Sequence, residues 1–274
     1  MDCCPRETAT AEQVVIVGAG ITGLSCAAAL AGEAEVVVID RIPVAGGVHG
    51  WKQPETERLV ERCGAELRLG VTATRWFGHE LLATGQDGPM RLHATALVIA
   101  TGTRPLGRAE LGIAGGRPAG ILPAPAACHL AENGLLAGRR PAVVGGGDWA
   151  RHAVDELLHA GASAVTVLAP DGLRLTMPRD HRVSVRVGVR PMSVGGSPRV
   201  ERVALSDGDT VDCDGLVLAH GVVALRNVDG AVWDGSAVVF AQPQTDPASI
   251  AGAERAGAAA AQSVRSMLMR RETQ

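Results

Sequence analysis

Three glycines near the start of the chain, Gly18, Gly20 and Gly23, stand between an apolar run and an alanine-rich stretch, VVIVGAGITGLSCAAAL. In this spacing the first glycine allows a tight turn, the second lets the backbone approach a pyrophosphate, and the third lets a helix pack closely on its strand. The free N–H groups and the dipole at the helix start attract phosphate. Asp40 ends the next apolar run, where a carboxylate can accept hydrogen bonds from a ribose. The sequence therefore predicts a bound dinucleotide.

The first candidate binding set comprises the glycine turn, the start of the helix and the end of the second strand: Gly18, Ala19, Gly20, Ile21, Thr22, Gly23, Asp40 and Arg41. We assign Asp40 to the ribose because an acid that ends a buried strand beside a glycine turn otherwise has no partner. Arg41 contacts the adenine or its phosphate, or lies on the plain surface. The sequence does not choose between these roles.

A second glycine pattern, PAVVGGGDWARHAVDELLHAGA, supplies Gly145, Gly147 and Ala150 in the middle of the chain. The strand expected after its helix ends at Ala169-Pro170, so the ribose carboxylate is missing there. This second site could hold NAD(P), another adenine nucleotide such as ATP, or nothing. Trp149 packs over this turn or in the core.

Apolar runs and turn residues place the elements around these motifs. In the first half we expect strands at Val14–Val17, Val36–Ile39 and Ala96–Ala100, a helix at about Glu55–Cys63, an irregular crossover at Arg104–Pro125 and a helix at Ala126–Leu136. Further on we expect strands at Ala142–Val144, Ala164–Leu168, 183–187, 200–205, 209–213 and 216–219, a helix ending at His159 and a C-terminal helix. The pattern predicts an α/β protein in which residues 1–103 and 215–274 form a discontinuous domain and residues 104–214 form a smaller, inserted one.

Composition excludes several classes of function. With 274 residues, a net charge of −3 and interspersed charges, the chain offers no nucleic-acid surface. No apolar stretch is long enough to span a membrane, and the first residues lack the pattern of a signal peptide, so we expect a cytoplasmic protein. The 6 cysteines form no CxxC pair, so the sequence predicts no metal site and no dithiol centre.

With these residues in hand, the chain resembles the two-dinucleotide-binding-domain flavoproteins, the superfamily of thioredoxin reductase and the pyridine nucleotide-disulfide oxidoreductases. The resemblance implies a Rossmann-like fold with FAD at the first glycine turn and an NAD(P)-type unit at VVGGGDWA. Gly46-Gly47 resembles the pair that passes the flavin pyrophosphate, and ALVIATG resembles the strand where the chain leaves the FAD domain. The cofactor set implied in addition is Gly46, Gly47, Val71, Ala100, Thr101, Gly102, Gly145 and Gly147.

A narrower resemblance rests on the stretch RPAGILPAPAACHLAENGLLAGRRPAVVGGG, which is most similar to the flavoprotein subunits of amine, opine, proline and hydrogen-cyanide-synthase dehydrogenases. It implies hydride transfer between flavin and a small amine or imino-acid metabolite. It also implies a second oxidoreductase subunit or a homo-oligomer as partner. No residue stands out as a catalytic acid or base.

The chain departs from the superfamily at three places that bear on function. The region between Gly47 and Glu55 is short, so part of the usual cover of the isoalloxazine ring is missing. Gln242-Pro243 stands where a Gly-Asp or Gly-Asn pair usually binds the ribityl chain, with Asp246 nearby as a substitute. Cys128 lies near the place of one redox cysteine, but Ala131 occupies the place of its partner. Dithiol chemistry is therefore not expected. Two alternatives stay open: a self-contained NAD(P)H:flavin oxidoreductase, and a non-catalytic nucleotide-binding partner subunit.

Overall fold

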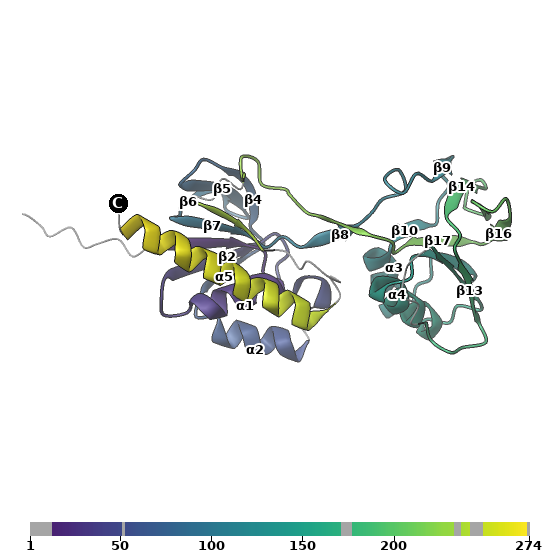
Figure 1. Ribbon diagram of the computed structural model, residues 1–274, viewed down its shortest axis with the longest axis horizontal. Coiled ribbons are helices and arrows are strands. Elements are labelled where there is room, and N and C mark those ends of the chain that lie inside the picture. The colour runs from purple at the N-terminus through teal and green to yellow at the C-terminus, as the bar shows by residue number, and fades with distance from the viewer. Residues whose placement is uncertain (1–12, 51–52, 171–176, 233–236, 242–248, 273–274) are drawn as a thin grey trace, which may run out of the picture. The chain divides into compact units, whose positions relative to one another are not determined.

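The computed structural model describes residues 13–50, 53–170, 177–232, 237–241 and 249–272. The chain divides into two compact units, residues 1–103 with 224–274, and residues 104–223. Each unit is built around its own parallel five-stranded sheet (Figure 1). The prediction of a Rossmann-like α/β fold is therefore confirmed.

In the first unit, the parallel sheet has the strand order β19-β7-β1-β2-β3. Its strands are β1 (Gln13–Val17), β2 (Glu35–Asp40), β3 (Glu66–Leu69), β7 (Ala96–Ile99) and β19 (Val238–Phe240). A three-stranded antiparallel sheet of β4 (Thr72–Trp76), β5 (Glu80–Gly85) and β6 (Gly88–His93) packs against it through a shared apolar core. The helical elements are α1 (Ile21–Leu30), η1 (Gly47–His49), α2 (Pro54–Arg62) and α5 (Ile250–Glu272).

The central strands are apolar throughout because both faces of the parallel sheet are covered. In β1 the four valine and isoleucine side chains after Gln13 are all buried. They point alternately into two cores, one shared with the helices and one shared with the antiparallel sheet. A buried run of this kind ends at Val17, so Gly18 begins the turn at the carboxyl edge of the sheet.

The long C-terminal helix α5 lies along α1 (Figure 1). Gly257 permits the close approach, since a Cβ atom there would lie 2.4 Å from the Thr22 carbonyl oxygen and 2.9 Å from the Cys26 amide nitrogen. Arg265 of α5 also pairs with Glu33 and donates to the Ala29 carbonyl at the end of α1. The C-terminal helix therefore supports the glycine-turn helix along its length.

In the second unit, the parallel sheet has the order β10-β17-β11-β12-β13. Its strands are β10 (Ile121–Pro123), β11 (Pro141–Val144), β12 (Val165–Ala169), β13 (Val183–Val187) and β17 (Gly215–Leu218). Helices α3 (Ala124–Glu132) and α4 (Asp148–His159) pack on one face through a common core. A second sheet contains β9 (Ala114–Gly115), β14 (Pro191–Gly195), β15 (Arg202–Leu205) and β16 (Thr210–Asp212). The chain passes between the units at β8 (Thr103–Pro105) and β18 (Val222–Ala224).

The structure corrects two sequence predictions and adds one strand that was not predicted. Strand β17 pairs with β10 and β11, so residues 215–223 belong to the second unit and not to the first. A short apolar run such as GLVL suits either parallel sheet, so sequence alone does not assign its partner. The stretch 104–125 is not an irregular crossover, because it carries strands β9 and β10, and α3 begins at Ala124 with a proline in its first turn. Strand β14 had not been predicted.

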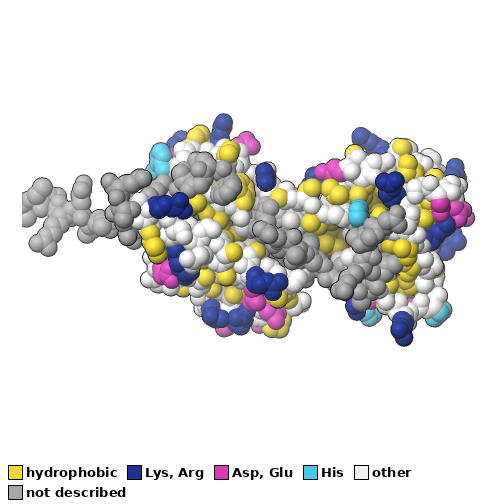
Figure 2. Space-filling view, in the orientation of Figure 1, with side chains coloured by type: hydrophobic (Ala, Val, Ile, Leu, Met, Phe, Trp, Pro, Cys, Tyr) yellow, Lys and Arg dark blue, Asp and Glu magenta, His cyan; other side chains and the backbone are white. Residues whose placement is uncertain are grey.

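On the face shown in Figure 2, basic and acidic side chains lie among one another over the described surface. This agrees with the small net charge of −3. Within the described residues, no helix has the length and apolar character needed to cross a membrane.

Candidate functional site

The first glycine turn joins the ends of three strands. Gly18 has a φ of +117°, and its N–H donates to the Ile39 carbonyl at 2.8 Å. A Cβ atom on Gly18 would lie 2.2 Å from the Ala100 carbonyl oxygen, and one on Gly23 would lie 1.9 Å from the Gly18 carbonyl oxygen. These contacts leave no space for a side chain. The predicted positions Gly18 to Gly23 thus form the turn and the first turn of α1, and Ala100 to Gly102 follow β7 beside them.

The start of α1 is open to an anion. Its N-cap, Gly20, makes no side-chain capping bond, and the first turn contains no acidic residue. Gly46 donates its N–H to the Ala19 carbonyl at 2.8 Å, and a Cβ atom on Gly47 would lie 3.1 Å from the Gly20 Cα. The two glycine segments therefore run backbone against backbone. Uncapped N–H groups at such a cradle suit a pyrophosphate, so the residues present fit a dinucleotide.

Asp40, at the end of β2, has hydrogen-bond partners within the protein, whereas the sequence analysis expected none apart from a ribose. One carboxylate oxygen accepts the N–H of Ala19 at 2.7 Å, and the other accepts the N–H of Ile42 at 2.8 Å. The turn itself aims the Ala19 N–H at the strand end. Since each carboxylate oxygen can accept more than one hydrogen bond, capacity for ribose hydroxyls remains.

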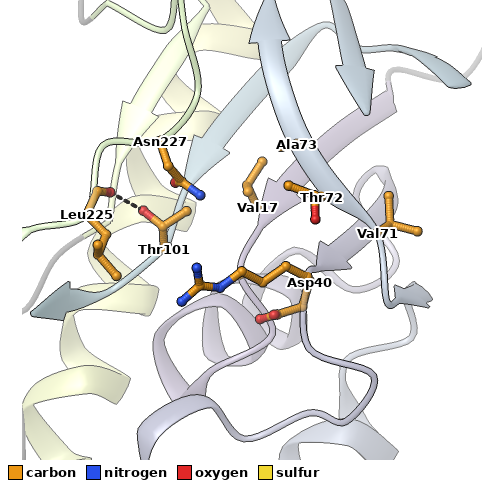
Figure 3. A pocket seen from close by; sticks show the side chains of 10 residues that line it. Val17, Asp40, Val71, Thr72, Ala73, Thr101, Leu225 and Asn227 are labelled. Atoms are coloured by element: carbon orange, nitrogen blue, oxygen red, sulfur yellow. Dashed lines mark hydrogen bonds between the residues drawn. The ribbon is translucent and has the colours of Figure 1, made fainter. Parts of the chain in front are cut away.

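Asp40 also lines a pocket in the first unit. Figure 3 shows polar atoms of Asp40, Thr72 and Asn227 reaching into the same space. The pocket brings together several predicted residues with others that the sequence did not suggest. The predicted ones are Gly18, Asp40, Arg41, Val71 and Thr101; the others are Val17, Thr72, Ala73, Leu225 and Asn227.

Leu225 and Asn227 reach this pocket only after the chain has returned from the second unit. No motif spacing could have indicated them. Thr72 and Ala73 directly follow the predicted Val71 at the start of β4. This neighbourhood in the sequence is the one signal that could have indicated them.

The second glycine turn repeats the backbone geometry of the first. Gly145 has a φ of +138°, donates to the Leu168 carbonyl at 2.9 Å, and would place a Cβ atom 2.7 Å from the Ala219 carbonyl oxygen. A Cβ atom on Gly147 would meet nothing within 4 Å. Strand β12 ends at Ala169, so no carboxylate stands where Asp40 stands in the first unit.

Two side chains near the second glycine turn, those of Trp149 and Cys128, lie in the apolar core of the second unit. Trp149, in the first turn of α4, is buried among apolar residues, and its indole N–H has no hydrogen-bond partner among the described residues. Cys128 of α3 is 4% exposed. Burial, and then the charges of Glu156 and Glu132, raise the pKa of the Cys128 thiol to about 12. Cys128 is therefore a protonated thiol packed as a small apolar residue at neutral pH.

The positions Gln242, Pro243 and Asp246, which concern the ribityl chain, lie outside the described residues.

Comparison with known proteins gives one family. Residues 12–246 match the family model described as pyridine nucleotide-disulphide oxidoreductase. Thioredoxin reductase from Lactococcus lactis superposes with a TM-score of 0.68 at 20% identity, over 95% of this chain and 100% of that chain. Thioredoxin reductase from T. acidophilum gives a TM-score of 0.67 at 20% identity, over 93% and 98% of the two chains. L-proline dehydrogenase from P. horikoshii gives 0.63 at 18% identity, over 94% of this chain and 59% of that chain. A search of curated protein sequences finds no significant match.

Proposed function

The chain belongs to the pyridine nucleotide-disulphide oxidoreductase family of FAD- and NAD(P)H-using enzymes, and on this premise we propose that it is a flavin-dependent dehydrogenase that works without a redox disulfide. We propose further that it acts as a subunit of a complex and oxidises a small amine or imino-acid metabolite.

The environment of Cys128 carries the first part of this proposal. Disulfide reduction by a dithiol needs two thiols within bonding reach, and the nucleophilic one must ionise. Cys128 is buried with a raised pKa, and Ala131 stands one helical turn further along α3. A single protonated thiol cannot cycle through an intradomain disulfide, and this supports a route for electrons that does not pass through Cys128.

The first glycine turn supports the cofactor assignment. Gly18 to Gly23 and Gly46-Gly47 would hold the pyrophosphate, and Asp40 would hold the adenosine ribose through its remaining acceptor capacity. FAD, when bound, supplies the acceptor for a hydride. The chain's own residues then position the cofactor.

Substrate class and partner rest on likeness. The stretch that contains α3 and the second glycine turn is similar to flavoprotein subunits of amine and proline dehydrogenases, and the fold matches the L-proline dehydrogenase of P. horikoshii. None of the candidate cofactor residues other than Asp40 and Arg41 carries an ionisable side chain. A substrate site completed by a second subunit agrees with that composition.

A self-contained NAD(P)H:flavin oxidoreductase is the second candidate, because the space beside the second glycine turn is open. Gly145 retains the positive φ of +138°, and the space beside Gly147 is open. A nicotinamide dinucleotide could bind there without the ribose carboxylate.

The small molecules that the denatured protein releases identify the cofactor. Loss of the yellow flavin colour on addition of a reductant identifies the reaction. We expect the purified full chain to be yellow and to release FAD on denaturation. Bleaching by L-proline or another amine, only with a co-purified subunit, would support the dehydrogenase. Loss of the flavin colour with NADH or NADPH alone would contradict the amine dehydrogenase and support the NAD(P)H:flavin oxidoreductase. Colourless protein without FAD would contradict both.

Asp40→Asn tests the ribose assignment. The amide keeps one acceptor for the two backbone N–H groups and loses the charge, so we expect FAD to bind roughly 10-fold more weakly. Asp87→Asn, a change to an exposed turn residue of the same unit, serves as the matched control. Equal FAD affinity in both variants would show that Asp40 does not bind the cofactor.

A further inference from the structure

The segment that returns from the second unit is fixed at both ends beside the pocket of Asp40. At one end, the Leu225 N–H donates to the Gly102 carbonyl at 2.9 Å, and the Thr101 hydroxyl donates to the Leu225 carbonyl (Figure 3). At the other end, the Asp229 N–H donates to the Thr74 carbonyl at 2.9 Å, and the Trp76 N–H donates to the Asp229 carbonyl at 2.8 Å. The segment between them therefore spans from β7 to β4.

The two neighbours of Asn227 are packed elsewhere. The Arg226 guanidinium lies 5.2 Å from the centre of the Phe240 ring, and Val228 is 7% exposed in the core under the antiparallel sheet. Asn227 is exposed, lines the pocket, and makes no hydrogen bond with the described residues. Its amide is thus a free donor and a free acceptor, held in place by backbone contacts on either side.

Two other groups around the pocket are already engaged, and the exposed Thr72 hydroxyl carries its donor and its acceptor on a single oxygen atom, so it cannot pair with two neighbouring ring positions. The Val71 N–H donates to the Asp40 backbone carbonyl at 2.8 Å, and the Thr101 hydroxyl is used by Leu225. Adenine presents an amino donor beside a ring-nitrogen acceptor, a pair that an asparagine amide can bind with two hydrogen bonds. Arg41 supplies only donors, and Asp40 only acceptors when ionised.

We propose that Asn227 recognises the adenine base of the bound nucleotide and makes this site selective for adenine over hypoxanthine. The inference rests on the proposed FAD site in the first unit. The nucleotide pocket is then complete only when the chain has returned from the second unit. Selectivity for the base comes from the return segment, and the ribose and pyrophosphate are bound by the first βαβ motif.

Binding of ADP and IDP to the flavin-free full chain tests the proposal. IDP carries hypoxanthine, in which a carbonyl oxygen replaces the amino group that the Asn227 oxygen would accept from. For the unmodified chain we expect ADP to bind about 10-fold more tightly than IDP. In Asn227→Ala, and in Asn227→Leu, which keeps the branched shape of the side chain without its polar atoms, the ratio should fall to about 1. Asn133→Ala, on the surface of the second unit, should keep it.

Each of the other outcomes overturns either this inference alone or this inference together with the proposed function. If the unmodified chain binds ADP and FAD but both Asn227 variants keep the preference for ADP, the base is read elsewhere and only this inference fails. Loss of discrimination between ADP and 2′-deoxy-ADP, with the preference over IDP intact, would place Asn227 on the ribose and also overturn it. If the unmodified chain binds neither FAD nor ADP, the proposed function fails together with it.

Discussion

The two glycine turns share a backbone and differ in what surrounds it. In both, a glycine with positive φ donates to the end of the second strand, and its missing Cβ leaves room for the carbonyl that ends a third strand. Around the first turn lie Gly23, Asp40 and the Gly46-Gly47 segment. Around the second lie Ala150, fully buried, and the strand end at Ala169.

The difference separates two demands on the sequence. The first glycine of each turn is required by chain closure, because three strand ends meet there whether or not a ligand binds. The third position and the terminal acid depend on how closely the helix and the phosphate approach. A Cβ atom on Gly23 would lie 1.9 Å from the Gly18 carbonyl oxygen, whereas the third position of the second turn carries the fully buried methyl group of Ala150. A glycine turn alone therefore indicates the fold, and the residues around it indicate the ligand.

Exchanging the third positions gives the largest expected effect. Gly23→Ala places a Cβ atom 1.9 Å from the Gly18 carbonyl oxygen, so α1 must move away from the turn. We expect FAD affinity to fall roughly 100-fold, equivalent to about 2.8 kcal/mol. The measurement is a fluorescence titration of flavin-free protein with FAD.

The reciprocal change is the control. Ala150→Gly should destabilise the second unit by about 1–2 kcal/mol, through lost helix propensity and a lost buried methyl group. FAD affinity should stay as in the unmodified chain. Equal losses of FAD in the two variants would mean that the turns do not differ in ligand binding.

The contact between α5 and α1 gives the next effect. Gly257→Ala would place a Cβ atom 2.4 Å from the Thr22 carbonyl oxygen and 2.7 Å from the Ser25 Cβ. Although alanine favours helix, we expect overpacking to destabilise the first unit by about 2 kcal/mol. Urea unfolding measures the change. Ala259→Leu, at an exposed position of the same helix, is the control and should be near neutral. A stabilised Gly257→Ala variant would show that α5 does not rest on α1 here.

Local signals in the sequence predicted most of the first unit, and contacts between distant segments explain the rest. The runs before Gly18 and Asp40 predicted β1, β2 and the turn, because each signal lies within one βαβ motif. The sheet of β17 could not be predicted, since its partners come from segments far along the chain. The same holds for Asn227, which enters the pocket from beyond the second unit. The partner of Asp40 was missed because a backbone N–H in a turn leaves no trace in the residue types.

Buried thiols should make the second unit more sensitive to alkali than the first. Burial raises the pKa of Cys128 to about 12 and that of Cys213 to about 11, both in the second unit, and that of Cys26 in the first unit to about 12, from 9.0. Because the folded pKa is the higher one, each thiol's contribution is complete below pH 9 and is lost as pH rises toward the folded value.

We expect the free energy of unfolding to fall above pH 9 by up to about 1.4 kcal/mol per pH unit for each thiol. Urea unfolding at a series of pH values measures the slope, and Cys128→Ala should reduce the slope of the second unit alone. A slope that is unchanged in Cys128→Ala would mean that this thiol already ionises near its ordinary pKa.

The far ends of the two glycine-turn helices are alike, and changes there should have the smallest effects. Arg265 pairs with Glu33 and donates to the Ala29 carbonyl of α1; Arg182 pairs with Asp180 and donates to the Leu158 carbonyl of α4 at 3.3 Å. A cation at a helix C-terminus is stabilising, but these pairs are largely exposed and screened by salt. Arg265→Gln and Arg182→Gln should each lower Tm by less than about 4 °C, and less in high salt.

The hydrogen bond from Arg265 also lowers the pKa of Glu33, so this contribution is lost as pH falls below 4.5. If the two variants show equal, small shifts in Tm and retain their FAD affinity, the two units differ in ligand binding only at the helix ends that face the glycine turns. A loss of FAD in Arg265→Gln alone would extend that difference along the whole of α1.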